Sequence, residues 1–330
     1  MVSAELSENF AATGRGAALR RFTSSDRRFR FLTQLAALSV VLLFSGIIVT
    51  LSVGAAPAFR AFGWSFFSTS AWNPVTQRFG AFPAIYGTLV TSALAMLIAV
   101  PVGIGIAIFL TELCPRQLKR PIGIAIELLA GIPSIIYGIW GFFVFVPFFQ
   151  ASVEPWLISV FANIPILGDL SAGPPYGIGI FTAAFILSIM ILPFISAVTR
   201  DVFATVPPIL KEAAYGLGCT TWEVMWQIVL PYSRSGVVGG AMLALGRALG
   251  ETMAVTFVVG NAHHINLSLL APGTTISATI ANEFAEALGD LYVPSLIALG
   301  LILFFITFVV LASAQILLRS LDSRSGGGSK

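Results

Sequence analysis

The sequence predicts an all-α integral membrane protein with six membrane-spanning helices. Of its 330 residues, 57% are hydrophobic and only 10% are charged, and the mean hydropathy is +0.92. A helix needs about 20 mainly apolar residues to cross a hydrocarbon core of roughly 30 Å. Six stretches qualify, at roughly 31–53, 85–110, 122–149, 176–199, 236–260 and 292–318. We therefore expect one domain over 31–318, between a basic tail at 1–30 and a short tail at 319–330.

The first apolar stretch resembles a signal peptide, because a basic region precedes it and Val53-Gly54-Ala55 matches a small-residue cleavage site. Its apolar run of about 20 residues exceeds the roughly 7 to 15 of a signal core, so we expect it to be retained as an anchor. We expect the basic tail to be solvated and disordered, with contact to anionic lipid headgroups as the alternative. The Gly-rich end at 326–329 is typical of a flexible linker.

Lys and Arg accumulate on the cytoplasmic side of membrane proteins, and here their distribution is strongly asymmetric. The loops at 54–84, 150–175 and 261–291 hold only Arg60 and Arg78. The alternate loops and both ends hold fifteen: Arg15, Arg20, Arg21, Arg27, Arg28, Arg30, Arg116, Lys119, Arg120, Arg200, Lys211, Arg234, Arg319, Arg324 and Lys330. Both termini and the loop at 200–235 are then predicted to be cytoplasmic.

Both cysteines, Cys114 and Cys219, fall on this same side in the predicted topology. Thiols stay reduced in the cytoplasm, so we expect no disulfide.

The loop at 200–235 carries the pattern E-A-A-x3-G-x9-I-x-L-P between two apolar stretches. Pro208 can begin a short helix, because a missing N–H costs nothing in the first turn. Gly218 supplies a turn, and Thr220 with Glu223 forms a capping box that begins a second short helix. Pro231 is expected to end that helix. The residues that define the pattern are Glu212, Ala213, Ala214, Gly218, Ile228, Leu230 and Pro231.

Such a unit of helix, turn and helix resembles the EAA loop of ABC importer permeases, the element that docks onto an ATPase. The resemblance implies a six-helix ABC importer transmembrane domain of type I, the MetI-like class, with cytoplasmic EAA coupling helices. The alternative is an ordinary cytoplasmic helical hairpin that matches the pattern by chance.

The fifth apolar stretch holds two charges, Arg247 and Glu251, which we expect on one helix face. At 1.5 Å of rise per residue, Arg247 lies about 17 Å beyond Gly236 and so near the bilayer centre. A charge there costs at least ~2.5 kcal/mol, so it faces protein or an aqueous path and has a partner. A guanidinium suits tetrahedral oxyanions, which predicts an anion site where Glu251 holds Arg247 when no anion is bound. The alternative is an ion pair that only fixes a helix interface.

Two further features bear on the membrane region. Glycines at 236, 240, 246 and 250 form two G-x-x-x-G pairs, which predict close approach to neighbouring helices. Glu127 lies about 10 Å beyond Arg120 in the third stretch. We expect a structural role for it and keep it as a candidate pathway residue in contact with Arg247, since an interhelical hydrogen bond is equally compatible. Kinks are predicted at Pro101, Pro133 and Pro193.

The loops on the predicted outer side offer weaker signals. His263 and His264 have no neighbouring Cys, so we expect two solvated imidazoles and no metal site. Aromatic residues crowd the first of these loops and predict a segment at the outer membrane interface, with a hydrophobic dock for a binding protein as the alternative. They are Phe59, Phe62, Trp64, Phe66, Phe67 and Trp72.

The segment from Gly246 to Asn261, GRALGETMAVTFVVGN, is similar to the fifth-helix region of phosphate ABC transporter permeases. Segments at 110–113, 119–130, 216–224 and 281–287 are similar too, and the resemblance covers roughly 31–318, departing at 1–30 and 262–275. It implies half of a heterodimeric channel, working with a second permease, a pair of ATPase subunits and an external phosphate-binding protein. In that family, positions matching Arg247 and Glu251 carry intramembrane charges.

Other patterns limit what this chain does by itself. It has no G-x-x-x-x-G-K-[ST] phosphate-binding loop, since its only lysines are Lys119, Lys211 and Lys330. We therefore expect a permease in a bacterial plasma membrane that is not an enzyme, with ATP and Mg on the partner ATPase, no cofactor of its own and no nucleic-acid partner. The alternatives are an ABC permease for another oxyanion, molybdate or sulfate, and an ATP-independent anion transporter, for which we would expect inverted repeats.

Overall fold

The structure is a computed structural model that describes residues 2–162, 164–165 and 167–325. The predicted linker at 326–329 and Lys330 lie outside the described residues. The chain divides into two compact units, Met1–Gly54 and Ala55–Lys330, and each is described by itself.

The first unit is the greater part of helix α1 (Val2–Phe62), which contains the predicted anchor. The backbone is already helical from Val2, whereas we expected a disordered tail at 1–30. No proline interrupts the sequence between 2 and 30, and proline is the residue that most strongly ends a helix.

Of the described residues, six helical stretches are long and apolar enough to cross a membrane, as predicted. They are Phe29–Phe62, Phe82–Leu113, Ser134–Phe161, Ile180–Ala204, Thr221–Leu249 and Tyr292–Ile316. The third and fifth differ from the predicted bounds, and both differences concern candidate functional residues.

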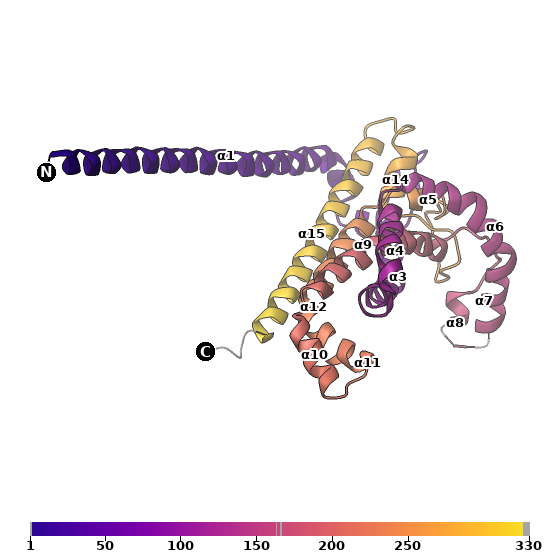
Figure 1. The fold of residues 1–330 in the computed structure, drawn as a ribbon. Coiled ribbons are helices and arrows are strands. Elements are labelled where there is room, and N and C mark those ends of the chain that lie inside the picture. Colours follow the sequence, from indigo (N-terminus) through magenta and orange to yellow (C-terminus); the bar gives the residue numbers. More distant parts are fainter. Residues whose placement is uncertain (1, 163, 166, 326–330) are drawn as a thin grey trace. The chain divides into compact units, whose positions relative to one another are not determined.

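Helix α9 (Ile180–Ala204) lies at the centre of the second unit (Figure 1). It packs along α3 (Phe82–Ile108) and along α12 (Leu230–Leu249). Gly236 and Gly240 of α12 lie against Val202 and Val198 of α9 so closely that a Cβ at Gly240 would come within 2.6 Å of Val198. The first predicted G-x-x-x-G pair therefore makes a close helix contact. In the second pair, Gly246 faces Leu311 of α15 (Tyr292–Ser325), and Gly250 meets only its own helix.

The third predicted span is wrong as a continuous helix over 122–149. Helix α4 (Arg116–Ala130) ends before Pro133, and α5 (Ser134–Trp140) begins after it. Pro133 therefore separates two helices instead of kinking one. Both α4 and α5 pack against α9, and a Cβ on Gly123 of α4 would meet Arg200 of α9. The chain continues through η2 (Gly141–Phe145), α6 (Val146–Phe148), η3 (Phe149–Val153), α7 (Glu154–Phe161) and α8 (Leu167–Leu170).

The loop at 200–235 forms α10 (Pro208–Gly216) and α11 (Thr221–Val224), as predicted. Pro231 was expected to end the second helix, and that is wrong. A π-helical turn, η4 (Met225–Val229), leads directly into α12, where Pro231 occupies the first turn and its missing N–H costs nothing.

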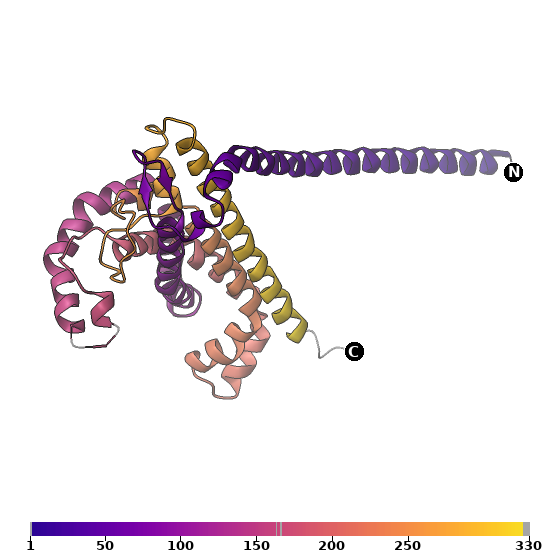
Figure 2. The ribbon, with the colours of Figure 1, turned by 180° about the vertical axis from the view of Figure 1, so that it is seen from behind.

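Several of the remaining elements lie at the other end of the second unit. Figures 1 and 2 both show α10 and α11 at the end opposite to α14 (Ile276–Glu283). Near α14 are the short helix α2 (Ser65–Ser68) and the antiparallel strands β1 (Trp72–Asn73) and β2 (Arg78–Phe79). A short helix α13 (Met253–Thr256) follows α12. A π-helical turn, η1 (Phe109–Leu113), ends the second span.

Candidate functional site

Helices α10 and α11, here called the coupling unit, have the local structure that the sequence predicts. Pro208 occupies the first turn of α10, and Gly218 adopts φ +91°, a left-handed conformation that favours glycine. The Thr220 hydroxyl accepts from the Glu223 N–H, and the Glu223 carboxylate accepts from the Thr220 N–H at 2.7 Å. The capping box is therefore confirmed, and it fixes the start of α11.

The outer face of the coupling unit, meaning the face that does not pack on α3 and α9, is apolar. Leu217, at the turn, is 87% exposed, and Ile209 and Trp222 are 71% and 67% exposed. Glu212 and Ala213 of the predicted pattern are exposed beside them. Soluble surfaces rarely leave such large apolar side chains together in water, and an exposed patch of this kind is typical of a protein interaction site.

The inner face of the coupling unit is packed onto the ends of α3 and α9. Ala214 and Val224 are buried in one cluster with Ala107 of α3 and Phe203 of α9. Ile228 and Leu230, which belong to the predicted pattern, pack against this cluster. The unit is therefore a rigid projection of the membrane helices.

An ion pair joins the coupling unit to the end of the second span. Lys211 Nζ on α10 lies 2.5 Å from Glu112 Oε1 on η1, and the two side chains are only 19% and 14% exposed. In the sequence, Lys211 stands out only as one of the basic residues of this loop. No signal in the sequence pairs it with an acid 99 residues away.

Arg247 lies in the last turn of α12 and is exposed in this chain. A Cβ on the neighbouring Gly246 would lie 3.3 Å from the side chain of Leu311 on α15. Leu311 is about 28 Å along that helix from Tyr292 at 1.5 Å per residue. The end of α12 therefore lies alongside the interior of a membrane-spanning helix.

Glu251 does not share a helix face with Arg247, because α12 ends at Leu249. In the described part of the chain, none of the ion pairs includes either residue. The Glu251 carboxylate instead accepts from the Ala254 N–H at 3.2 Å, at the start of α13. The expectation that Glu251 holds Arg247 is therefore wrong for this structure, because the helix ends between the two residues.

Helix α13, which follows the end of α12, packs against α5. Gly138 of α5 lies against α13, where a Cβ would come within 3.0 Å of the Met253 carbonyl oxygen. At the end of α4, the Tyr137 hydroxyl donates to the Leu129 carbonyl at 2.8 Å, so a side chain satisfies a carbonyl at the helix end. Irregular backbone at membrane depth is tolerated only where protein buries it or where it lines a cavity, and transporters place their binding sites at such broken helices.

Glu127 is not in the span with which it was grouped. It lies on α4, where its Oε1 is 2.8 Å from Arg200 Nη1 on α9. The predicted contact with Arg247 is absent from the ion pairs of the described residues, because Arg200 already occupies the carboxylate. An interhelical polar contact, the expected structural role, is what the structure contains.

A largely buried carboxylate that no sequence pattern indicated lies at the end of α14. Glu283 accepts hydrogen bonds from Trp72 Nε1 and from the Tyr292 hydroxyl, and its Oε1 lies 2.9 Å from His263 Nε2. His263 also stacks on Trp72 and is 17% exposed, so the expectation of a solvated imidazole is wrong for it. Burial raises the pKa of the Glu283 carboxyl, but the hydrogen bonds stabilise the carboxylate and hold its pKa below the ordinary value.

Most of the aromatic residues that crowd the first outer loop belong to a hydrophobic core cluster. Phe66 and Phe79 are buried with Tyr292, and Phe59 and Phe62 pack against the same cluster. Of the predicted interfacial residues, Trp64 at 88% and Phe67 at 38% remain well exposed.

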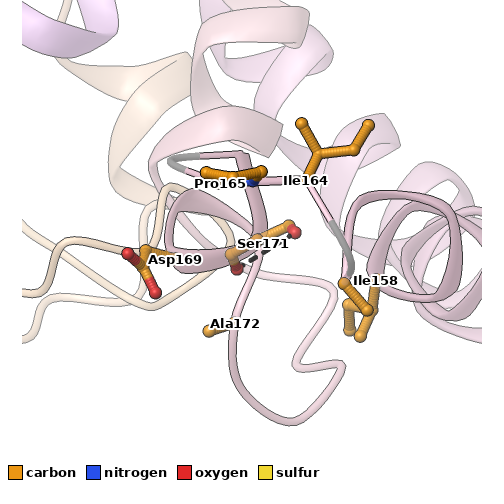
Figure 3. A pocket seen from close by; sticks show the side chains of 8 residues that line it. Ile158, Ile164, Pro165, Asp169, Ser171 and Ala172 are labelled. Carbon is orange, nitrogen blue, oxygen red and sulfur yellow. Dashed lines mark hydrogen bonds between the residues drawn. The ribbon is translucent and has the colours of Figure 1, made fainter.

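A cavity of about 450 Å³ lies between α7, α8 and the following loop (Figure 3). Its lining includes none of the candidate residues predicted from the sequence. The lining residues are Ile158, Ala162, Ile164, Pro165, Gly168, Asp169, Ser171 and Ala172.

The fold and the coupling unit define a class of protein. The family model described as "binding-protein-dependent transport system inner membrane component" matches residues 99–324, and the chain belongs to this family. It is therefore a multi-pass inner-membrane permease subunit of an ABC transporter.

Relatives within the family are more specific. The chain is 63% identical over 314 residues to "Phosphate transport system permease protein PstC" of Mesorhizobium japonicum, covering 95% of this chain and 96% of that protein. It is 56% identical over 298 residues to the protein of the same name in Pasteurella multocida, covering 90% and 93%.

Solved structures support the fold at lower identity. A bacterial ABC transporter that imports alginate matches with a TM-score of 0.59 and 19% identity over 90% of this chain and 98% of that one. The MetNI methionine ABC transporter matches with a TM-score of 0.52 and 16% identity over 73% and 94%. The predicted type I, MetI-like fold is confirmed.

Proposed function

We propose that this chain is one of two transmembrane subunits of an ATP-driven importer of inorganic phosphate. The observation that carries the proposal is the 63% identity, over nearly the full length of both chains, to a phosphate transport permease. An exposed guanidinium at the end of a broken membrane helix supports it, because a fork of charged donors suits a tetrahedral oxyanion.

The partners are a PstA-like second permease, a PstB-like ATPase dimer and a PstS-like extracytoplasmic phosphate-binding protein. The apolar outer face of the coupling unit is the surface that docks onto the ATPase, through Glu212 and Ala213 of the pattern and the exposed Leu217 beside them. ATP and Mg bind to that partner. This chain holds no cofactor and no catalytic group of its own.

The excess of Lys and Arg places the coupling unit and both termini in the cytoplasm. In this orientation, α14 and the Glu283 cluster are on the outer side, where the binding protein delivers its anion. Lipid surrounds the spans, and nucleic acid has no role.

Transport follows from the rigid attachment of the coupling unit. Closure of the ATPase dimer displaces α10 and α11, and the displacement moves α3 and α9 because these four helices share one buried cluster. The path then opens outward and phosphate reaches Arg247, which compensates its charge. Glu251, just past the end of α12, accepts a hydrogen bond from a protonated phosphate oxygen, which fully ionised sulfate cannot donate.

The test is uptake by the four-component complex in proteoliposomes, with labelled phosphate, sulfate and molybdate. The proposal predicts uptake of phosphate that requires ATP and Mg and that excess sulfate does not inhibit. Preferential uptake of sulfate or molybdate would instead favour an ABC permease for another oxyanion. Phosphate uptake without the ATPase subunits would favour an ATP-independent transporter.

A further inference from the structure

The contact between Lys211 and Glu112 differs from the rest of the attachment of the coupling unit. Of the ion pairs in the described part of the chain, it is the one that includes a residue of α10. The unit also packs on α3 and α9 through a buried apolar cluster. Apolar packing has no preferred direction, whereas an ion pair of two largely buried side chains fixes one relative position, because separating them leaves a buried charge without a partner.

The backbone conformation at Glu112 directs its side chain toward Lys211. Glu112 lies in η1, a π-helical turn at the end of α3. A π turn inserts one residue into an α-helix, and one residue corresponds to about 100° of rotation about the helix axis. Without η1, Glu112 would point about a quarter-turn away from its present direction. Turns of this kind occur frequently at functional sites.

The junction of η1 and α4 is also linked to α9. Helix α4 begins immediately after η1, separated from it only by Cys114 and Pro115, and α4 is joined to α9 through Glu127 and Arg200. Displacement of Glu112 by α10 therefore moves the end of α3 and the start of α4 together.

We propose that Lys211 and Glu112 form the contact that transmits displacement of the coupling unit to the second span. They act as positioning residues, because neither one touches the anion. The inference rests on the proposed function, since it assumes that an ATPase displaces α10.

The experiment compares phosphate uptake with ATP hydrolysis in one sample of the reconstituted four-component complex. The variants are Lys211→Met, Glu112→Gln, and the reversed pair Glu112→Lys with Lys211→Glu. Lys119→Met is the matched control, because Lys119 is an exposed lysine on the adjacent α4 and has no ion pair among the described residues. A role in stability alone would change the amount of assembled complex and leave the number of ATP molecules hydrolysed per phosphate unchanged.

Each single substitution is expected to raise the ATP hydrolysed per phosphate by at least about fivefold, the lower end of typical coupling between sites. The reversed pair restores most of the ratio, and Lys119→Met leaves it unchanged. An unchanged ratio in both single variants overturns the inference. If the single variants do not assemble, the reversed pair decides: an assembled complex that stays uncoupled overturns it, and a coupled one supports it. If the unmodified complex transports another anion, the proposed substrate is wrong, and the same ratio measured with that anion still tests the ion pair.

Discussion

Arg200 on α9 reaches across Gly123 of α4 and places its Nη1 atom 2.8 Å from Oε1 of Glu127. Its Nη2 atom lies 3.0 Å from Asp201, so one guanidinium holds two carboxylates at the end of the fourth span. The charge of Glu127 is therefore compensated by Arg200, and Glu127 is not a partner of Arg247. The contact joins α9 to α4, the helix that ends just before the break at Pro133.

Substitution of Glu127 by Gln is therefore expected to leave phosphate uptake nearly unchanged. The pair is partly exposed, with side chains 26% and 49% accessible, and exposed pairs contribute only about 0–1 kcal/mol. Thermal unfolding of the purified complex checks the small effect on stability, and uptake in proteoliposomes checks the unchanged transport. Loss of uptake by an assembled Glu127→Gln complex would instead indicate that Glu127 lines the transport pathway.

Removal of the cap on α11 should loosen the coupling unit. Thr220→Ala takes away the hydroxyl that accepts from the Glu223 N–H, and loss of such a cap costs about 1 kcal/mol. Hydrogen exchange of residues 208–230 measures the loss of protection. Thr221→Ala is the control, because Thr221 is the next threonine and does not cap the helix. Equal exchange in the two variants would contradict the assignment of the cap.

The close contact between α12 and α9 predicts a sharp difference between two adjacent glycines. A Cβ at Gly240 would lie 2.6 Å from Val198, whereas a Cβ at Gly239 has no neighbour nearer than 3.9 Å. Gly240→Ala should destabilise the protein by about 1–3 kcal/mol through overpacking. Gly239→Ala should be neutral or stabilising, because alanine favours a helix. Unfolding measured side by side settles the comparison, and similar melting temperatures for the two variants would refute the packing.

The Glu283 cluster predicts a loss of stability in acid. Its pKa is lowered in the folded state, so its contribution is fully present above the unfolded value of about 4.3 and is lost as the pH falls through the lower folded value. Glu283→Gln should remove this part of the pH dependence. Melting temperatures between about pH 7 and pH 3 check it, with the exposed Glu286→Gln as control. An identical acid profile in Glu283→Gln would exclude this role.

Features that depend on local chemistry could be predicted from the sequence. The six apolar stretches, the capping box at Thr220 and the helix beginning at Pro208 need only neighbouring residues, and all are present. Two features failed because they depend on how other parts of the chain fold. Pro231 lies in the first turn of a helix because α11 continues through η4 into α12, and His263 is largely enclosed because it pairs with Glu283 and stacks on Trp72.

Which charged side chains pair with each other could not be predicted from the sequence either. The sequence places Arg247 and Glu251 four residues apart, which suggests a pair on a helix, but it does not reveal that the helix ends between them. The pairs Lys211–Glu112 and Arg200–Glu127 join segments 99 and 73 residues apart, and only the fold brings them together.

Phosphate uptake by a complex that carries Arg247→Lys tests the central claim most directly. Lysine keeps the positive charge and removes the planar fork of donors that suits an oxyanion. We predict loss of ATP-dependent phosphate uptake in a complex that still assembles and still hydrolyses ATP, while Arg78→Lys, an exposed arginine on β2, transports normally. Normal uptake by the Arg247→Lys complex would contradict the account.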